Sequence, residues 1–219
     1  MTLFADPRAA SGVVLLLVQI VLAVPLIVRV FRARSGLGIS LTGEAIWMVA
    51  GVGWAIYGAV SGSAALIASG SIAAVTSSLM VVALWSLVPG QRRPALIVSA
   101  VTLFGFVAGV LLAGWPGLSV ALSVFGVVQY IPQLRQSARA LRQRTVTRGV
   151  SVVGASLRAA YAAGWAVYGG AWWLWGLTVD RIDWPLAVWG LAGAVTFALQ
   201  ALVAARSPTS QGHMRQSEK

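Results

Sequence analysis

Hydrophobic residues along this chain gather in seven long runs that short polar breaks separate. An α-helix needs about twenty apolar residues to cross a hydrocarbon core about 30 Å thick. The runs lie near residues 11–31, 42–60, 64–88, 94–113, 116–136, 151–170 and 184–205. The breaks are Ser35-Gly36, Ser61-Gly62-Ser63, Pro89-Gly90, Gly114-Trp115-Pro116-Gly117 and a charged run before Gly149. We therefore predict an all-α integral membrane protein with seven transmembrane helices.

Composition agrees with lipid as the solvent. Of 219 residues, 58% are hydrophobic and 10% are charged, and the mean hydropathy is +0.85. In soluble domains charged residues approach a quarter. The first run, Ser11 to Phe31, is longer than a typical signal-peptide core and ends in arginines. It is therefore predicted to be a retained helix.

The positions of the basic residues predict the orientation. The chain has sixteen Lys and Arg against five acids, a net charge of +11. Alternate loops hold thirteen basic residues on one side and only Arg8 and Arg181 on the other. Basic residues are retained on the cytoplasmic side. We expect the N-terminus outside, the C-terminus inside and an odd number of spans.

Few residues are suited to catalysis or metal binding. There is no cysteine, and the single histidine, His213, lies in a polar tail. A membrane enzyme would need a cluster of acids, histidines or metal ligands, so we predict no catalytic residue, no metal and no cofactor. The stretch from Arg135 to Arg148 is interpreted as a cytoplasmic loop that touches anionic lipid head groups, not as a nucleic-acid-binding arm.

An internal repeat organises the chain. GISLTGEAIWMVAGVGWAIYG from Gly38 aligns without gaps on GVSVVGASLRAAYAAGWAVYG from Gly149. Eight of twenty-one positions are identical, and matched Trp, Tyr and Ser residues do not follow from membrane composition alone. The identical pairs are Gly38 and Gly149, Ser40 and Ser151, Gly43 and Gly154, Gly53 and Gly164, Trp54 and Trp165, Ala55 and Ala166, Tyr57 and Tyr168, and Gly58 and Gly169.

Flanking helices extend each copy to a three-helix unit. A proline helix precedes each copy, with Pro25 in the first and Pro132 in the second, and Ala-Val-Thr recurs in the helix that follows, ending at Thr76 and Thr196. The predicted organisation is 1–88 as the first unit, 89–115 as a connector helix, 116–205 as the second unit and 206–219 as a polar cytoplasmic tail. The unpaired connector makes the two units parallel, related by an axis along the membrane normal.

Each repeat copy begins with G-x-S, ends with W-x-x-Y-G and follows a proline-glutamine type of helix. This combination resembles the PQ-loop superfamily, which includes the SWEET sugar transporters and the half-sized SemiSWEETs. The resemblance covers nearly the whole chain. The second copy carries the signature as Pro132-Gln133, whereas the first has Pro25-Leu26. The resemblance implies two three-helix bundles around a central solute path that opens alternately to either side. It implies hinges at Pro25 and at Pro132 with Gln133; a kink that only shapes packing is the alternative.

The resemblance also assigns the paired aromatic residues. It implies that Trp54 and Trp165 line the solute pocket, where a ring stacks on the apolar face of a sugar, and that Tyr57 and Tyr168 form an external gate. Each Trp and Tyr pair is three residues apart and shares a helix face. Anchoring at the lipid interface is the alternative for these aromatic residues.

Four further polar side chains inside the spans are candidates. Thr76 and Thr196 are candidates for facing the solute path, although a threonine hydroxyl often bonds its own helix backbone. Glu44 and Arg158 occupy neighbouring depths in opposite units, where an inner-gate ion pair is one interpretation. Snorkelling of Arg158 to the cytoplasmic surface is the other.

Together these observations predict a facilitative, alternating-access carrier of a small neutral solute, with a sugar as the first candidate. Sugar carriers of the resembling family place an asparagine on the third helix of each bundle, and this chain has no asparagine. No aspartate lies in a span, so uncoupled transport is the simpler mechanism. An exporter of amino acids or other small metabolites is the alternative, and a non-transporting receptor or scaffold is the alternative of another class. Assembly of the chain into a homo-oligomer is a further open alternative.

The chain is rich in Ala and Gly and uses Arg in preference to Lys, a composition that suggests a GC-rich bacterial source. We therefore expect a multi-pass protein of the bacterial inner membrane.

Overall fold

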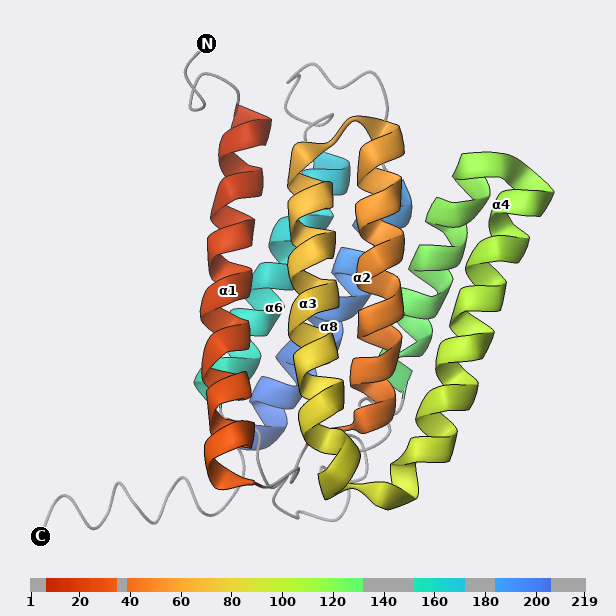
Figure 1. The fold of residues 1–219 in the computed structure, drawn as a ribbon. Helices are drawn as coiled ribbons and strands as arrows, with labels where there is room; N and C mark the ends of the chain where they lie inside the picture. The colour runs from red at the N-terminus through yellow and green to blue at the C-terminus, as the bar shows by residue number, and fades with distance from the viewer. Residues whose placement is uncertain (1–6, 35–38, 132–151, 172–183, 206–219) are drawn as a thin grey trace, which may run out of the picture.

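The computed structural model describes residues 7–34, 39–131, 152–171 and 184–205 (Figure 1). Within these ranges every regular element is helical. The elements are α1 (Pro7–Ala33), α2 (Leu41–Ser61), α3 (Ala64–Leu87), a 3₁₀ turn η2 (Pro89–Gln91), α4 (Arg92–Val128), α6 (Val152–Ala166), a π-helical segment η3 (Val167–Ala171) and α8 (Trp184–Ala205).

Five stretches of the described chain are long and apolar enough to cross a membrane: Ala10–Arg32, Leu41–Ser61, Ala64–Leu87, Pro89–Val128 and Trp184–Ala205. Large apolar side chains are strongly exposed on them; Phe104 is 74% and Leu112 is 87% exposed. Such a surface is unfavourable in water and favourable in hydrocarbon. The prediction of an all-helical fold is therefore confirmed for the described residues, and their long apolar helices suggest a multi-pass membrane protein.

Helix α4 folds back on itself. Ala113 and Gly114 have non-helical backbone angles, and Gly114 has φ +64°, a left-handed conformation that glycine adopts without steric cost. The two arms then pack closely, with Gly109 against the backbone of Gly117 and the rings of Phe106 and Phe125 edge to face at 5.7 Å. The reversal is visible at the top of Figure 1, at the break predicted from the sequence.

The turn between α2 and α3 is a pair of helix caps. Gly62 ends α2 with φ +69°, and its N–H donates to the carbonyls of Gly58 and Ala59. Ser63 then begins α3, and its side chain accepts from the N–H of Leu66. The predicted breaks at Ser61-Gly62-Ser63 and at Pro89-Gly90 are thus confirmed. The breaks at Ser35-Gly36 and before Gly149 lie outside the described residues.

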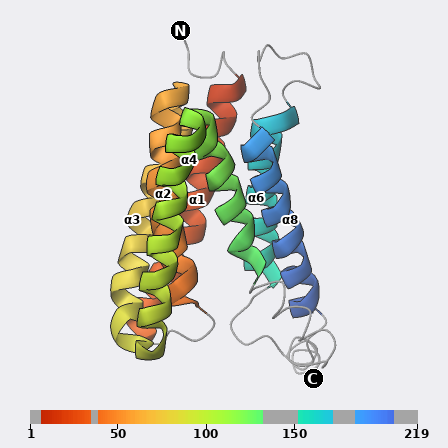
Figure 2. The same cartoon turned by 90° about the vertical axis from the view of Figure 1, so that its right-hand side faces the viewer.

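The helices pack as two groups (Figures 1 and 2). In the first group, α3 packs against both α1 and α2. In the second group, α8 packs against both α6 and α4. We call α1, α2 and α3 the first unit, and the second arm of α4, α6 and α8 the second unit. In both units the third helix contacts the other two, and α2 with α4, and α1 with α6, join the units.

Small residues permit this packing. A Cβ added to Gly51 would lie 2.5 Å from the backbone nitrogen of Ala74, and one added to Gly58 would lie 2.6 Å from that of Ile67. Gly70 and Gly190 likewise lie against the backbone of Ala55 and Ala166, whereas Gly53 and Gly193 lie against side chains. Helices α2 and α3, and helices α6 and α8, therefore touch backbone to backbone.

Candidate functional site

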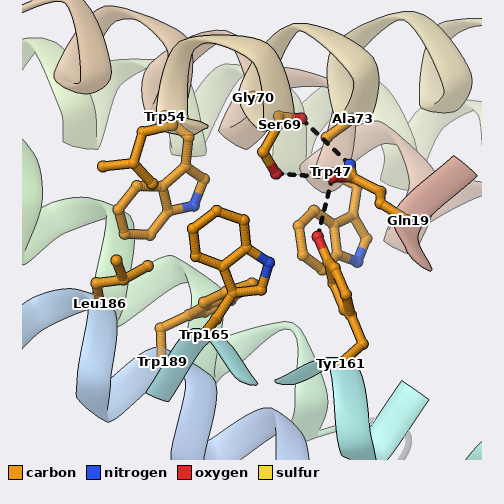
Figure 3. Close-up of a pocket in the computed structure, with 11 residues that line it drawn as sticks. Gln19, Trp47, Trp54, Ser69, Gly70, Ala73, Tyr161, Trp165, Leu186 and Trp189 are labelled. Atoms are coloured by element: carbon orange, nitrogen blue, oxygen red, sulfur yellow. Dashed lines mark hydrogen bonds between the residues drawn. The ribbon is translucent and has the colours of Figure 1, made fainter. Parts of the chain in front are cut away.

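A small cavity lies where the two units meet. Side chains from α1, α2 and α3 face side chains from α6 and α8 across it (Figure 3). Its volume is about 20 Å³, room for roughly one water molecule, so a larger solute enters only when side chains or helices move. The lining residues are Gln19, Trp47, Trp54, Leu66, Ser69, Gly70, Ala73, Tyr161, Trp165, Leu186 and Trp189.

Trp54 and Trp165, the matched tryptophans of the repeat, both line this cavity. Their exposed fractions are 5% and 1%, so neither ring faces lipid. The Trp54 ring packs against Trp189 at 5.7 Å, and the Trp165 ring lies between Tyr161 at 6.3 Å and Tyr168 at 5.2 Å. The fold thus brings together two residues 111 positions apart. Their contact with a solute stays a prediction.

A hydrogen-bonded polar cluster forms one wall of the cavity (Figure 3). The Ser69 hydroxyl donates to Gln19 Oε1 at 2.7 Å, and the Tyr161 hydroxyl donates to the same oxygen at 3.0 Å. Gln19 Nε2 donates to the Ser69 carbonyl at 3.2 Å. Because Gln19 and Ser69 belong to the first unit and Tyr161 to the second, this cluster links the units.

Two indole donors at the cavity lack an acceptor among the described residues. Nε1 of Trp165 and Nε1 of Trp189 are buried without a hydrogen-bond partner. Trp165 lies beside the Tyr161 hydroxyl but not in hydrogen-bonding geometry. An unpaired buried N–H costs about 1–3 kcal/mol. These donors therefore favour a ligand or water that brings an acceptor.

The two predicted gate tyrosines differ in their surroundings. Tyr168 is buried in the π-helical segment η3, and its hydroxyl lies 3.1 Å from the Ser63 hydroxyl, which belongs to the other unit. Tyr57 lies in the regular helix α2, half-buried, with its ring against Trp54 at 5.9 Å. The structure thus places Tyr168 as a bridge between the units at the end of the cavity where α2 ends.

The predicted hinge residues are only partly described. Pro25 is exposed inside α1, which is helical from Pro7 to Ala33 on both sides of it. Pro132 and Gln133 lie outside the described residues, as does the basic stretch from Arg135 to Arg148. The hinge role therefore stays a prediction.

Thr76 and Thr196 do not reach the cavity. The Thr76 hydroxyl donates to the carbonyl of Ile72 at 2.7 Å, and the Thr196 hydroxyl donates to that of Ala192 at 2.8 Å. Neither residue is part of the lining. Both hydroxyls are satisfied by their own helix, which was the alternative interpretation for them, so their predicted contact with a solute gains no support from the geometry.

Glu44 in α2 and Arg158 in α6 belong to different units and interact electrostatically. The Glu44 carboxylate also lies beside Ser77. The Arg158 guanidinium also lies 5.9 Å from the centre of the Phe197 ring. Both side chains are only partly accessible. The fold therefore places the two residues close enough to interact electrostatically, and their role as an inner gate stays a prediction.

Gln19, Trp47, Tyr161 and Trp189 line the cavity but were not among the candidates from the sequence. A signal for Gln19 existed, since it is the only polar side chain between Gly12 and Val28. The signal for Trp189 was weaker: when Thr76 is aligned with Thr196, Trp189 corresponds to Ser69 of the first copy. Trp47 and Tyr161 have no matching aromatic residue in the other repeat copy, so the repeat gave no reason to select them.

The lining side chains carry amide, hydroxyl and indole groups but no acid, base or thiol. No group of three His, Cys, Asp or Glu side chains suited to a metal is found in the described part of the chain. Hydrogen bonding and ring stacking are therefore the interactions that this cavity offers. No model of a known protein family matches the chain, and no curated protein matches it at a significant level.

Proposed function

We propose that this chain is a facilitative carrier that moves a small neutral solute, with a sugar as the first candidate, across a membrane by alternating access. The observation that carries the proposal is the placement of Trp54 and Trp165. These equivalent residues of an internal repeat line one cavity between two units of like helix packing. A pair of large rings from equivalent repeat positions at such a junction suits a solute with flat apolar faces.

The proposed topology has seven crossings, with the N-terminus outside. The stretch Pro89–Val128 has 40 residues, which as a straight helix would be about twice as long as the hydrocarbon core is thick. Its reversal at Gly114 therefore supports two crossings. Helix α6 and η3 together cover 152–171, which suffices for one more. Together with the basic-residue bias, these lengths support a multi-pass membrane protein. The bacterial inner membrane is proposed only from the composition of the chain.

The chemistry of the lining supports a neutral solute. The lining has no acidic or basic side chain that would pair with a charged solute, and a charge taken out of water without such a partner is costly. No acidic, basic or thiol side chain lines the cavity among the described residues, so we propose transport without proton coupling and without enzymatic activity. The cluster of Glu44 and Arg158 lies outside the lining and suits an inner gate.

Uptake into proteoliposomes tests the proposal. Purified protein would be assayed with radiolabelled sugars and amino acids, with and without a proton gradient. We expect saturable flux of at least one neutral solute and no effect of the gradient. Trp54→Ala and Trp165→Ala should each lower that flux at least tenfold. Trp184→Ala, which removes a 64% exposed ring at the start of α8, is the matched control and should not.

The same assay separates the carrier from its alternatives. Gradient-driven accumulation of an amino acid would favour an exporter of that class. Absence of flux for every solute, from protein shown to be folded, would contradict the carrier and leave a receptor or scaffold.

A further inference from the structure

The orientation of the Gln19 amide is determined by its neighbours. The Ser69 carbonyl is only an acceptor, so the atom that bonds it at 3.2 Å must be the amide nitrogen. The amide oxygen then faces the Ser69 and Tyr161 hydroxyls. An oxygen of this kind only accepts, so both hydroxyls must donate to it.

This arrangement leaves the two hydroxyls as acceptors. A hydroxyl has one proton, and in Ser69 and Tyr161 that proton is directed at Gln19 Oε1. What each oxygen still offers to the cavity is its lone pairs. A solute group next to them must therefore bring a hydrogen-bond donor.

The aromatic part of the cavity has the opposite preference. Indole nitrogens only donate, and those of Trp165 and Trp189 are buried without a partner among the described residues. A solute group beside these rings must bring an acceptor. The cavity thus has an accepting wall and a donating wall.

The accepting wall exists only once. With Pro25 aligned on Pro132, Gln19 corresponds to Gly126, and Ser69 corresponds to Trp189 by the alignment of the third helices. Tyr161 corresponds to Ala50 in the repeat. The second unit therefore has a glycine and a tryptophan where the first has a glutamine and a serine, and the two units offer different groups to a solute.

We propose that Gln19 determines the selectivity of this cavity: by holding the Ser69 and Tyr161 hydroxyls as acceptors, it makes the site bind neutral solutes that carry a hydroxyl or amide hydrogen-bond donor. The proposal rests on the carrier function and names the chemistry that its solute must have. Removal of the Gln19 amide frees both hydroxyls to rotate and donate, so the requirement for a donor on the solute disappears.

Binding to the full-length protein in detergent tests this, because binding is measured without flux. Apparent dissociation constants would be obtained from thermal stabilisation titrated with matched probes. The pairs are D-glucose with its 2-, 3-, 4- and 6-deoxyfluoro analogues, and propionamide with N,N-dimethylpropionamide. The second member of each pair has lost a donor and kept an acceptor. In the unmodified protein we expect at least one donor-deficient probe to bind about tenfold or more weakly than its parent, the usual effect of an unpaired buried polar group.

Two variants and a control complete the experiment. In Gln19→Leu the ratio of dissociation constants within that pair should fall to about threefold or less. Tyr161→Phe, which keeps the ring and removes one of the two acceptors, should lower the same ratio and serves if the first variant folds poorly. Thr102→Val removes a buried hydroxyl that is bonded within α4, and it should leave the ratio unchanged.

Three results would overturn the proposal: equal binding of both members of every pair, an unchanged ratio in both variants, or no binding of any probe. Flux is judged separately. Discriminating binding without flux would contradict the carrier but support the donor requirement. Flux of a solute without any donor discrimination would support the carrier and contradict the role of Gln19.

Discussion

The indole ring of Trp189 lies directly over Gly126, so closely that a Cβ on the glycine would collide with it. In the first unit the corresponding pair is Gln19 and Ser69, which are joined by two hydrogen bonds. In the first unit the larger residue, Gln19, lies on the first helix and the small one on the third. In the second unit the small residue, Gly126, lies on the first helix and the large one on the third. The same space at the junction is therefore filled by a polar contact on one side and by an aromatic one on the other.

Gly126→Gln should destabilise the protein, because the new side chain displaces the Trp189 ring. Overpacking of this kind costs about 1–3 kcal/mol, which should appear as a lower melting temperature in detergent. Gly90→Ala is the control, since a Cβ at Gly90 meets nothing within 4 Å. Adding Trp189→Ser, which copies the first unit, should recover at least half of the loss. A double variant no more stable than Gly126→Gln would contradict this packing relationship.

Tyr168→Phe should open the cavity toward the end of the molecule where α2 ends, because it removes the hydroxyl next to Ser63. A neutral hydrogen bond contributes about 1 kcal/mol, so the open population should rise about fivefold. The chain lacks cysteine, so Ala73→Cys, in the cavity lining, provides a single thiol. Its labelling by an impermeant reagent from that side measures the opening.

Ser63→Ala removes the same contact but also the cap of α3, so Tyr168→Phe is the cleaner variant. Thr102→Val in the same Ala73→Cys background is the control and should leave the labelling rate unchanged. An equal labelling rate with and without the Tyr168 hydroxyl would show that this contact does not hold the cavity closed.

Glu44 and Arg158 should be energetically coupled. Glu44→Gln removes the negative charge that faces a partly buried guanidinium, and Arg158→Gln removes the matching positive charge. The double variant should be less destabilised than the sum of the single variants, with a coupling of about 0.5–3 kcal/mol. Thermal or denaturant unfolding of the four proteins measures it. Additive effects would favour the interpretation that Arg158 extends to the cytoplasmic surface.

Pro132→Ala should abolish flux while expression stays intact, because it restores a continuous helix where a hinge is expected. Pro25→Ala tests the corresponding position in α1 and should also lower flux. Pro185→Ala is the control: Pro185 lies in the first turn of α8, where proline breaks no hydrogen bond. Unchanged transport in the first two variants would reduce both prolines to a role in packing.

The sequence alone was sufficient for the features that depend on neighbours along the chain. Apolar run length predicted helices that suit a membrane, and Gly62 and Gly114 predicted where two of those helices end, because solvent and backbone sterics act locally. The repeat also placed Trp54 and Trp165 at equivalent positions, which the common cavity agrees with.

Only the tertiary structure decided which side chains meet. The Gln19 amide accepts from residues 50 and 142 positions away, and no local pattern predicts such a contact. The sequence left two interpretations for the Thr76 and Thr196 hydroxyls, contact with a solute or a bond to their own helix, and the structure shows the bonds to Ile72 and Ala192. The sequence thus predicts the helices and the corresponding positions of the two repeat copies, whereas the packing of α1 against α3 and α6 determines the chemistry of the cavity.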